Sequence, residues 1–156
     1  MNKKLIQVDL QNPLHCAQVV HLLNDYMEDE MGISEPMPDG LGPKIIEGLK
    51  RHTAYMGFFV CIGDNFAGLA NCNLNFSTWR ASPLINIHDL IVSPDFRQQG
   101  VGLFLLKGIE NYAIENGYCR INLEVRHDNF KAQNLYRKAG FKECEPNNFF
   151  WENKLK

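Results

Sequence analysis

Residues 93–102, with the sequence SPDFRQQGVG, connect two apolar runs and constrain the fold more than any other stretch of the chain. The run before this segment ends at Val92, and the run after it begins at Leu103. A short apolar run, a glycine-containing turn and a longer apolar segment are typical of a strand that leads into a helix. We therefore expect a strand up to Val92 and a helix that closes at Gly117.

The sequence after that helix predicts a second strand and a second helix. Residues 120–126, RINLEVR, alternate apolar and polar side chains, which is the pattern of a strand with one buried face. A helix is expected within residues 127–141, with Asp128 or Asn129 as its N-cap and Gly140 just past its end. A strand–helix–strand–helix order predicts a parallel strand pair inside a mixed sheet of an α/β domain.

The rest of the chain also mixes strands and helices, and no repeat or linker divides it. Asn12 is the expected N-cap of a first helix, with Pro13 at its first position. In chain order we expect a strand at residues 5–9, a helix from residue 13 to near Gly32, a loop at residues 35–43, a short helix around residues 45–49, two strands within residues 55–76 joined by a turn at Gly63-Asp64-Asn65, a strand at residues 83–92 and a last strand at residues 147–155.

The composition predicts one soluble globular domain of 156 residues, since 45% of the residues are hydrophobic and 22% are charged. A net charge of -2 offers no broad basic surface for nucleic acid, and no apolar run reaches membrane-spanning length. Without a signal peptide at the N-terminus, we expect a cytoplasmic protein whose five cysteines are reduced. The histidines lack metal-ligand spacing; His15 and His21, for example, are six residues apart, so no metal site is expected.

Two glycines precede the helix that follows the SPDFRQQGVG segment, and they point to an anion site. Gly100 and Gly102 allow close approach to the unpaired N–H groups at the helix start, and Arg97 could add a charged contact. The alternative is a tight turn without a ligand. A Walker loop would need lysine where Leu103 stands, and a dinucleotide fingerprint would need glycine at Leu105. Two interpretations of the pattern therefore remain: a site for another phosphate-bearing ligand, or a turn that binds no ligand.

Longer segments around this turn resemble the GCN5-related N-acetyltransferase (GNAT) superfamily. RQQGVG matches its Arg/Gln-x-x-Gly-x-Gly/Ala signature, within the segment IHDLIVSPDFRQQGVG. LEVRHDNFKAQNLYRKAGF is similar to the segment that follows in the family, so that the resemblance spans about residues 85–145. It implies the GNAT fold: a central, mostly antiparallel sheet with a splayed parallel strand pair, flanked by about four helices.

The resemblance also implies acetyl-CoA as co-substrate and assigns residues to it. The pyrophosphate would rest on backbone amides at the helix start, the pantetheine arm would meet the end of the preceding strand, and Asn129 would lie near the thiol. The implied cofactor-binding residues are Leu90, Ile91, Val92, Arg97, Gln98, Gln99, Gly100, Val101, Gly102, Leu103 and Asn129.

Acetyl transfer to an amine needs a base for the ammonium proton and an acid for the departing thiolate. By the resemblance, Tyr136 is the acid, although its place on an apolar helix face is also compatible with packing alone. Glu124 is one candidate base, in a setting similar to the ribosomal-protein alanine N-acetyltransferases. His88 is the other, at a position where polyamine-acetylating relatives tend to carry glutamate. The alternative without catalysis is that Glu124 is a solvated strand glutamate and that His88 is a hydrogen-bonded strand histidine.

The sequence therefore predicts an acetyl-CoA-dependent N-acetyltransferase that acts on a primary amine of a small molecule or peptide by direct transfer in a ternary complex. Its expected partners are acetyl-CoA and the amine acceptor, with no nucleic acid or membrane, and a homodimer is a candidate assembly. An acyl-CoA-binding sensor without catalysis and an unrelated phosphate-binding module are the alternatives. The acidic residues of DYMEDE, Asp25 to Glu30, either attract a cationic amine or form a solvated helix end.

Overall fold

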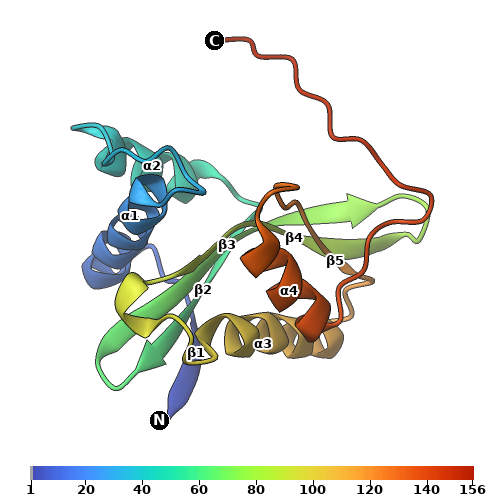
Figure 1. Cartoon of the computed structure of the whole chain (residues 1–156), viewed down its shortest axis with the longest axis horizontal. Helices are drawn as coiled ribbons and strands as arrows, with labels where there is room; N and C mark the ends of the chain where they lie inside the picture. Colours follow the sequence, from blue (N-terminus) through green and yellow to red (C-terminus); the bar gives the residue numbers. More distant parts are fainter. Residues whose placement is uncertain (1) are drawn as a thin grey trace.

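The computed structural model describes residues 2–156, which form one five-stranded sheet with α-helices on both faces (Figure 1). The elements in chain order are β1 (Lys3–Gln7), α1 (Pro13–Glu28), α2 (Leu41–Arg51), β2 (Tyr55–Ile62), β3 (Asn65–Ser77), β4 (Ser82–Val92), the short 3-10 helix η1 (Pro94–Phe96), α3 (Val101–Glu115), β5 (Ile121–Leu123) and α4 (Phe130–Ala139).

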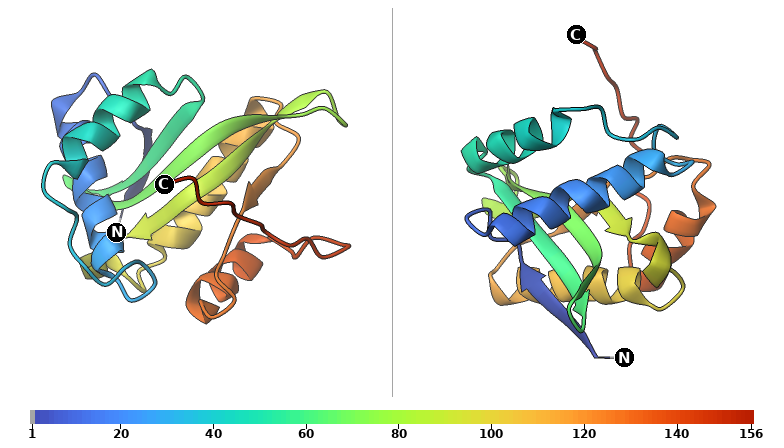
Figure 2. Two further views of the ribbon diagram at one scale, coloured as in Figure 1. Left: turned by 90° about the horizontal axis from the view of Figure 1, so that it is seen from above. Right: turned by 90° about the vertical axis from the view of Figure 1, so that its left-hand side faces the viewer.

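The sheet has the order β1-β2-β3-β4-β5 and is mixed, as the sequence predicts. Neighbours from β1 to β4 are antiparallel, whereas β4 and β5 are parallel. Figure 2 shows α1 and α2 on one face of the sheet and α3 on the other, with α4 beside α3. The helix between β4 and β5 makes this parallel connection possible, because a parallel pair needs a crossover.

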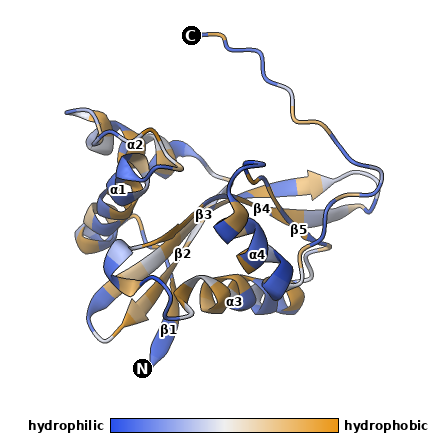
Figure 3. Cartoon of the chain, viewed as in Figure 1, coloured by the Kyte–Doolittle hydropathy of each residue, from blue (hydrophilic) through white to orange (hydrophobic). Residues whose placement is uncertain are grey.

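Apolar residues of the central strands face two hydrophobic clusters, one under α3 and one under α1 and α2. Phe58 belongs to the cluster on the α3 side and Phe59 to the cluster on the α1 side, and both are almost fully buried. Successive strand residues point to opposite faces, so a sheet covered on both faces needs apolar residues at consecutive positions. The hydropathy colouring of Figure 3 shows this: apolar residues dominate the strands and α3, while the outward side of α4 is hydrophilic.

Two helix starts confirm the predicted caps. The Asn12 side chain accepts a hydrogen bond from the Leu14 N–H at 2.9 Å, and Asn129 accepts one from the Ala132 N–H at 3.1 Å. Gly140 ends α4 with a φ of 100°, in the left-handed region that glycine adopts easily. Within residues 2–156, no helix is both long and apolar enough to cross a bilayer.

Several predicted boundaries differ from the structure. Helix α1 ends at Glu28 rather than near Gly32, because the Asp29 backbone leaves the helical region. Helix α2 begins at Leu41, inside the predicted loop. Strand β5 is shorter than residues 120–126, since β4 is its one pairing partner and the pairing stops at Leu123.

The predicted last strand at residues 147–155 is wrong. The chain after Phe141 forms no helix or strand and extends away from the sheet (Figure 1). Its aromatic residues have high strand propensity, but propensity forms a strand only where a partner supplies hydrogen bonds. Phe149 and Trp151 are consequently 86% and 85% exposed.

Candidate active site

The parallel strands β4 and β5 separate after a short pairing, and this opening organises the candidate site. Three residue pairs connect the two strands, the last being Ile87 with Leu123. Beyond Ile87, β4 stays paired with β3 up to Val92. Residues 88–92 therefore have one edge in the sheet and one edge that β5 does not cover.

The two candidate bases, His88 and Glu124, are the next residues on each strand after that last pair. His88 is the extra residue of a β-bulge, because Asn71 pairs with Asp89 and the neighbouring Cys72 pairs with Ile87. Both candidate side chains are exposed. The structure therefore brings them to opposite sides of the opening.

Tyr136, the predicted acid, lies on α4 and packs against the hydrophobic cluster on the α3 side. Burial, together with the nearby Tyr26, raises the pKa of Tyr136 to about 12. Its hydroxyl is therefore protonated at neutral pH and able to donate a proton or a hydrogen bond. Tyr26 lies near the C-terminal end of α1, so α1 brings this side chain near enough to Tyr136 to affect its pKa.

The glycine-containing turn before α3 uses its two glycines in different ways. Gly100 has a φ of 73° and is the N-cap of α3, with no side-chain cap from the described residues. A Cβ added at Gly102 would lie 2.8 Å from Leu135 Cδ2, so this glycine lets α3 approach α4 closely. The first N–H groups of α3 are left for an anion, and a Cβ built on Gly100 would meet no other atom within 4 Å. The turn fits a phosphate group.

Arg97, expected to contact the cofactor, binds groups of the protein itself. Its guanidinium Nη2 lies 2.9 Å from Asp29 Oδ2, and its Nε donates to the Val92 carbonyl at 3.3 Å. The Met31 N–H and then Arg97 lower the pKa of Asp29, although partial burial opposes them. In this arrangement Arg97 ties the turn before α3 to the segment after α1.

Sequence reasoning missed a polar chain that crosses three strands next to the opening. The Tyr55 hydroxyl donates to Asn71 Oδ1 at 2.9 Å, and Asn71 Nδ2 donates to Asp89 Oδ2 at 3.0 Å. Burial, aided by the charges of Cys72 and Asp89, raises the pKa of Tyr55. The sequence feature that could have indicated this chain of hydrogen bonds is one polar residue in the middle of each of two apolar strands, Asn71 and Asp89.

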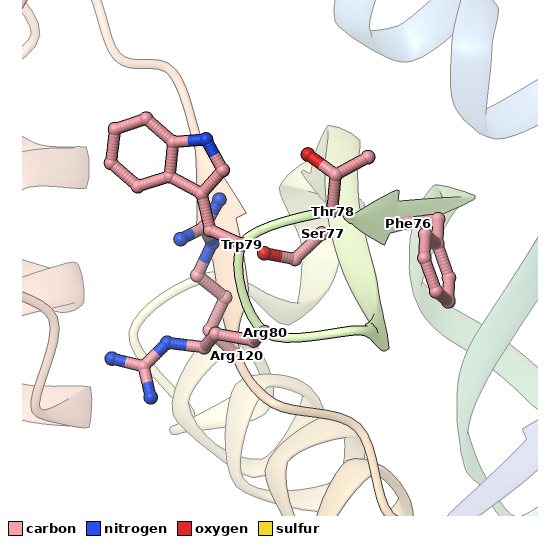
Figure 4. Close-up of a pocket in the computed structure, with 6 residues that line it drawn as sticks. All are labelled: Phe76, Ser77, Thr78, Trp79, Arg80 and Arg120. Carbon is pink, nitrogen blue, oxygen red and sulfur yellow. The ribbon is translucent and has the colours of Figure 1, made fainter.

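A separate surface hollow of about 440 Å³ lies at the turn between β3 and β4, and none of the predicted catalytic or cofactor-binding residues lines it. Figure 4 shows Phe76 and Trp79 on different sides of this turn. Trp79 is 98% exposed. The hollow is lined by Phe76, Ser77, Thr78, Trp79, Arg80 and Arg120.

Within residues 2–156, no three histidine, cysteine, aspartate or glutamate side chains are grouped so that they could hold a metal ion.

Comparisons with known proteins identify the family and the fold. A family described as the acetyltransferase (GNAT) family matches residues 18–141. An uncharacterized N-acetyltransferase of Methanocaldococcus jannaschii is 34% identical over 91 residues, which are 57% of this chain and 40% of that protein. Streptothricin acetyltransferase of Streptomyces lavendulae is 31% identical over 109 residues, which are 69% of this chain and 56% of that protein. The chain thus spans about half the length of these curated relatives.

A solved structure of a probable acetyltransferase shares the fold. Its TM-score is 0.84 at 20% identity, covering 98% of this chain and 99% of that chain. The likeness confirms the predicted mixed sheet with its parallel pair and flanking helices, and the family match confirms the resemblance carried by the two sequence segments.

Proposed function

Because the chain belongs to the acetyltransferase (GNAT) family, we propose that it is an acetyl-CoA-dependent N-acetyltransferase. The acetyl group would pass directly to a primary amine of a small molecule or peptide in a ternary complex. The observation that carries the proposal is the separation of β4 and β5 after Ile87 and Leu123, which leaves His88 and Glu124 as the next residues on the two strands. The same β4 leads into the uncapped start of α3, a fitting place for the phosphates of the co-substrate.

In this proposal the pyrophosphate of acetyl-CoA binds the backbone N–H groups of residues 98–103. The pantetheine arm binds the uncovered edge of residues 90–92, whose other edge pairs with β3. Asn129 uses its side-chain oxygen to cap α4, which leaves its Nδ2 group to donate to the co-substrate. Arg97 would contact a phosphate oxygen in one of two ways: it keeps its ion pair with Asp29, or it breaks that ion pair and turns to the phosphate.

The proposed chemistry removes two protons from the ammonium nitrogen, one before and one after it bonds to the acetyl carbon, and adds one proton to the departing thiolate. An alkylammonium with a pKa of about 10.4 is only about one part in 10³ neutral near pH 7.4, so a base has to remove its proton. Glu124 or His88 would do this, directly or through water. The neutral nitrogen then forms the bond to the acetyl carbon as the carbon–sulfur bond breaks, and Tyr136 donates a proton to the sulfur. The acetylated nitrogen loses its second proton, which returns Tyr136 to its protonated form.

The acceptor class is supported by the names of relatives. Streptothricin acetyltransferase and the thialysine N-epsilon-acetyltransferases, such as that of Caenorhabditis elegans at 25% identity over 133 residues, are named for amine-bearing small molecules. We propose a small-molecule amine for this chain as well, in the cytoplasm and without a nucleic-acid or membrane partner.

Acetyl-CoA is expected to raise the melting temperature of the protein, because a ligand at a hundred times its Kd adds about 2.7 kcal/mol to the free energy of unfolding. Thermal unfolding with increasing acetyl-CoA measures the shift. Gly100→Val should weaken it, since a β-branched residue is strained at the φ of 73°. Gly63→Val is the matched control, because Gly63 has a φ of 58° in the turn between β2 and β3, away from α3. No shift with the wild-type protein would contradict the proposal.

Release of free CoA thiol across a panel of amines then tests catalysis. Binding of acetyl-CoA without thiol release for any amine would favour the acyl-CoA sensor and contradict the enzyme.

We further propose a homodimer in which the chain after Phe141 binds a second copy. Four large apolar side chains of this tail are 70–88% exposed: Phe149, Phe150, Trp151 and Leu155. On the body of the molecule, β5 has a free edge, and beside it lies a hollow of about 260 Å³ lined by apolar residues that include Ile121 and Ile114. In strand addition, an extended segment of one chain pairs with the free edge of a strand in another chain, and this protein has both features.

Removal of residues 147–156 is expected to convert the dimer into a monomer, because the deletion removes all four exposed apolar side chains. Light scattering coupled to gel filtration, over a wide range of protein concentration, measures the mass. Trp79→Ala is the control, since it removes a side chain that is 98% exposed at another place and should leave the dimer intact. A monomeric full-length protein at every concentration would contradict this assembly.

A further inference from the structure

The β-bulge at His88 determines which face of the sheet Asp89 occupies. Ile85 and Ile87 belong to the hydrophobic cluster on the α3 side, whereas Ile91 belongs to the cluster on the α1 side. In a regular strand these odd-numbered residues would share one face. The extra residue shifts the alternation, so Asp89 shares the face of Ile91, where α1 lies. Without the bulge, Asp89 would face the apolar cluster under α3.

Asp89 is held by a neutral partner. It accepts a hydrogen bond from Asn71 Nδ2 at 3.0 Å, and Tyr55 donates to the other end of the same amide at 2.9 Å. Within residues 2–156, Asp89 forms no ion pair with a lysine, arginine or histidine. The chain therefore fixes the position of this carboxylate but does not neutralise its charge.

Two other carboxylates near the opening have arginine partners. Asp29 lies 2.9 Å from Arg97, and Asp128 lies 2.8 Å from Arg126. A cationic ligand that approaches either of these carboxylates has to compete with an arginine. At Asp89 it does not, since the partner there is an uncharged amide.

Asp89 also lies close to the groups that surround the opening. Tyr26 is near enough that, after burial, the negative charge of Asp89 is the next contribution that raises the pKa of Tyr26. Tyr26 in turn raises the pKa of Tyr136. Asp89, two residues beyond the last pair of β4 and β5, therefore lies near Tyr26 of α1, and Tyr26 lies near Tyr136 of α4.

We propose that Asp89 binds an ammonium group of the acceptor, and that the preferred acceptors carry at least two ammonium groups and no carboxylate. This inference rests on the proposed acetyl transfer. A monoamine loses its attraction to Asp89 when the reacting nitrogen gives up its proton, whereas a second ammonium group retains it. A carboxylate on the acceptor is repelled by the same charge.

Three probes of equal chain length test the proposal: putrescine, n-butylamine and γ-aminobutyrate. The wild-type enzyme should have its highest kcat/KM with putrescine and its lowest with γ-aminobutyrate. Asp89→Asn should lower kcat/KM for putrescine by about tenfold or more, mainly through KM, because it removes the charge from a charge-assisted hydrogen bond. The preference for putrescine over n-butylamine should shrink, and Asp89→Glu should restore part of it.

Asp64→Asn is the matched control, with the same change of charge in the exposed turn between β2 and β3. It should leave the three kcat/KM values unchanged. A wild-type enzyme that does not prefer putrescine would overturn the proposal, whether or not the variants fold. An equal loss for all three probes in Asp89→Asn, accompanied by a lower melting temperature, would assign Asp89 to stability alone and also overturn it.

Calorimetric titration of putrescine into the protein separates this inference from the proposed function. Putrescine should bind both the free protein and the protein loaded with CoA, which has no acetyl group to transfer, and Asp89→Asn should weaken that binding by about tenfold. Failure of acetyl-CoA to shift the melting temperature would contradict the proposed function while this titration still tests Asp89. An acetyl-CoA shift without any putrescine binding would overturn the role of Asp89 and leave the acetyltransferase proposal standing.

Discussion

Tyr136→Phe is expected to lower kcat roughly a hundredfold, in line with the loss of a general acid. The substitution removes the hydroxyl and retains the ring that packs against the cluster under α3. Because the pKa of Tyr136 is raised to about 12, its hydroxyl is protonated over the whole range in which the enzyme would be assayed. Steady-state kinetics with saturating acetyl-CoA measure the effect, and the Kd of acetyl-CoA should stay the same.

Tyr112→Phe is the matched control for this substitution. Tyr112 lies on α3 and packs with Phe58 at a ring-centroid distance of 5.1 Å, so it tests the loss of a half-buried tyrosine hydroxyl outside the opening. An unchanged kcat in Tyr136→Phe would remove Tyr136 from the mechanism. A similar loss in both variants would attribute the effect to packing.

The raised pKa of Tyr136 also predicts a contribution to stability with a definite sign. The folded state holds the phenolic proton more tightly than the unfolded chain, where the pKa is near 10. This contribution is therefore fully present below about pH 10 and is lost as the pH rises towards about 12.

Local features of the fold could be predicted because they depend on neighbouring residues. Asn12 and Asn129 cap helices through N–H groups two or three residues away, and Gly100 adopts its left-handed conformation within the turn itself. The parallel pair also followed from local order, since a strand, a helix and a strand in sequence leave few arrangements. These parts of the site needed no knowledge of distant residues.

Other features depend on contacts between distant residues, and the sequence pattern did not predict them. The face of Asp89 is set by a bulge against Asn71 and Cys72 on β3, and the alternation of β4 read alone would place it on the wrong face. Arg97 was expected at a phosphate, but it meets Asp29 from the end of α1. The proximity of Tyr26 on α1 to Tyr136 on α4 likewise depends on the tertiary arrangement of segments far apart in the sequence.

The strand predicted at residues 147–155 failed for the same reason. The pattern of its residues was suited to a strand, yet none of the five strands within residues 2–156 pairs with it. High strand propensity describes a residue's fit to a sheet, and the sheet has to be supplied from elsewhere. The proposed dimer supplies it from a second copy.

Glu124→Gln is expected to lower kcat/KM roughly a hundredfold, the loss that follows removal of a general base. His88→Gln is expected to have a much smaller effect. Both residues follow the last pair of β4 and β5, so proximity to the opening does not distinguish them. Their faces do. Carried one residue further, the alternation of β5 places Glu124 on the side of Asn122, which bonds to Asn86 away from the cluster under α3.

That side is also the side of Asp89, where the proposed acceptor would enter. The pH dependence of kcat/KM provides the decisive measurement, because the rate of a base-assisted transfer falls as the pH falls through the pKa of the base. Glu124→Gln should remove this acidic limb, and His88→Gln should leave it in place. The reverse result would make His88 the base, and an intact limb in both variants would exclude both residues. Equal acetyl-CoA shifts of the melting temperature in the two variants would show that the co-substrate site is unchanged, so that the difference in rate belongs to proton transfer.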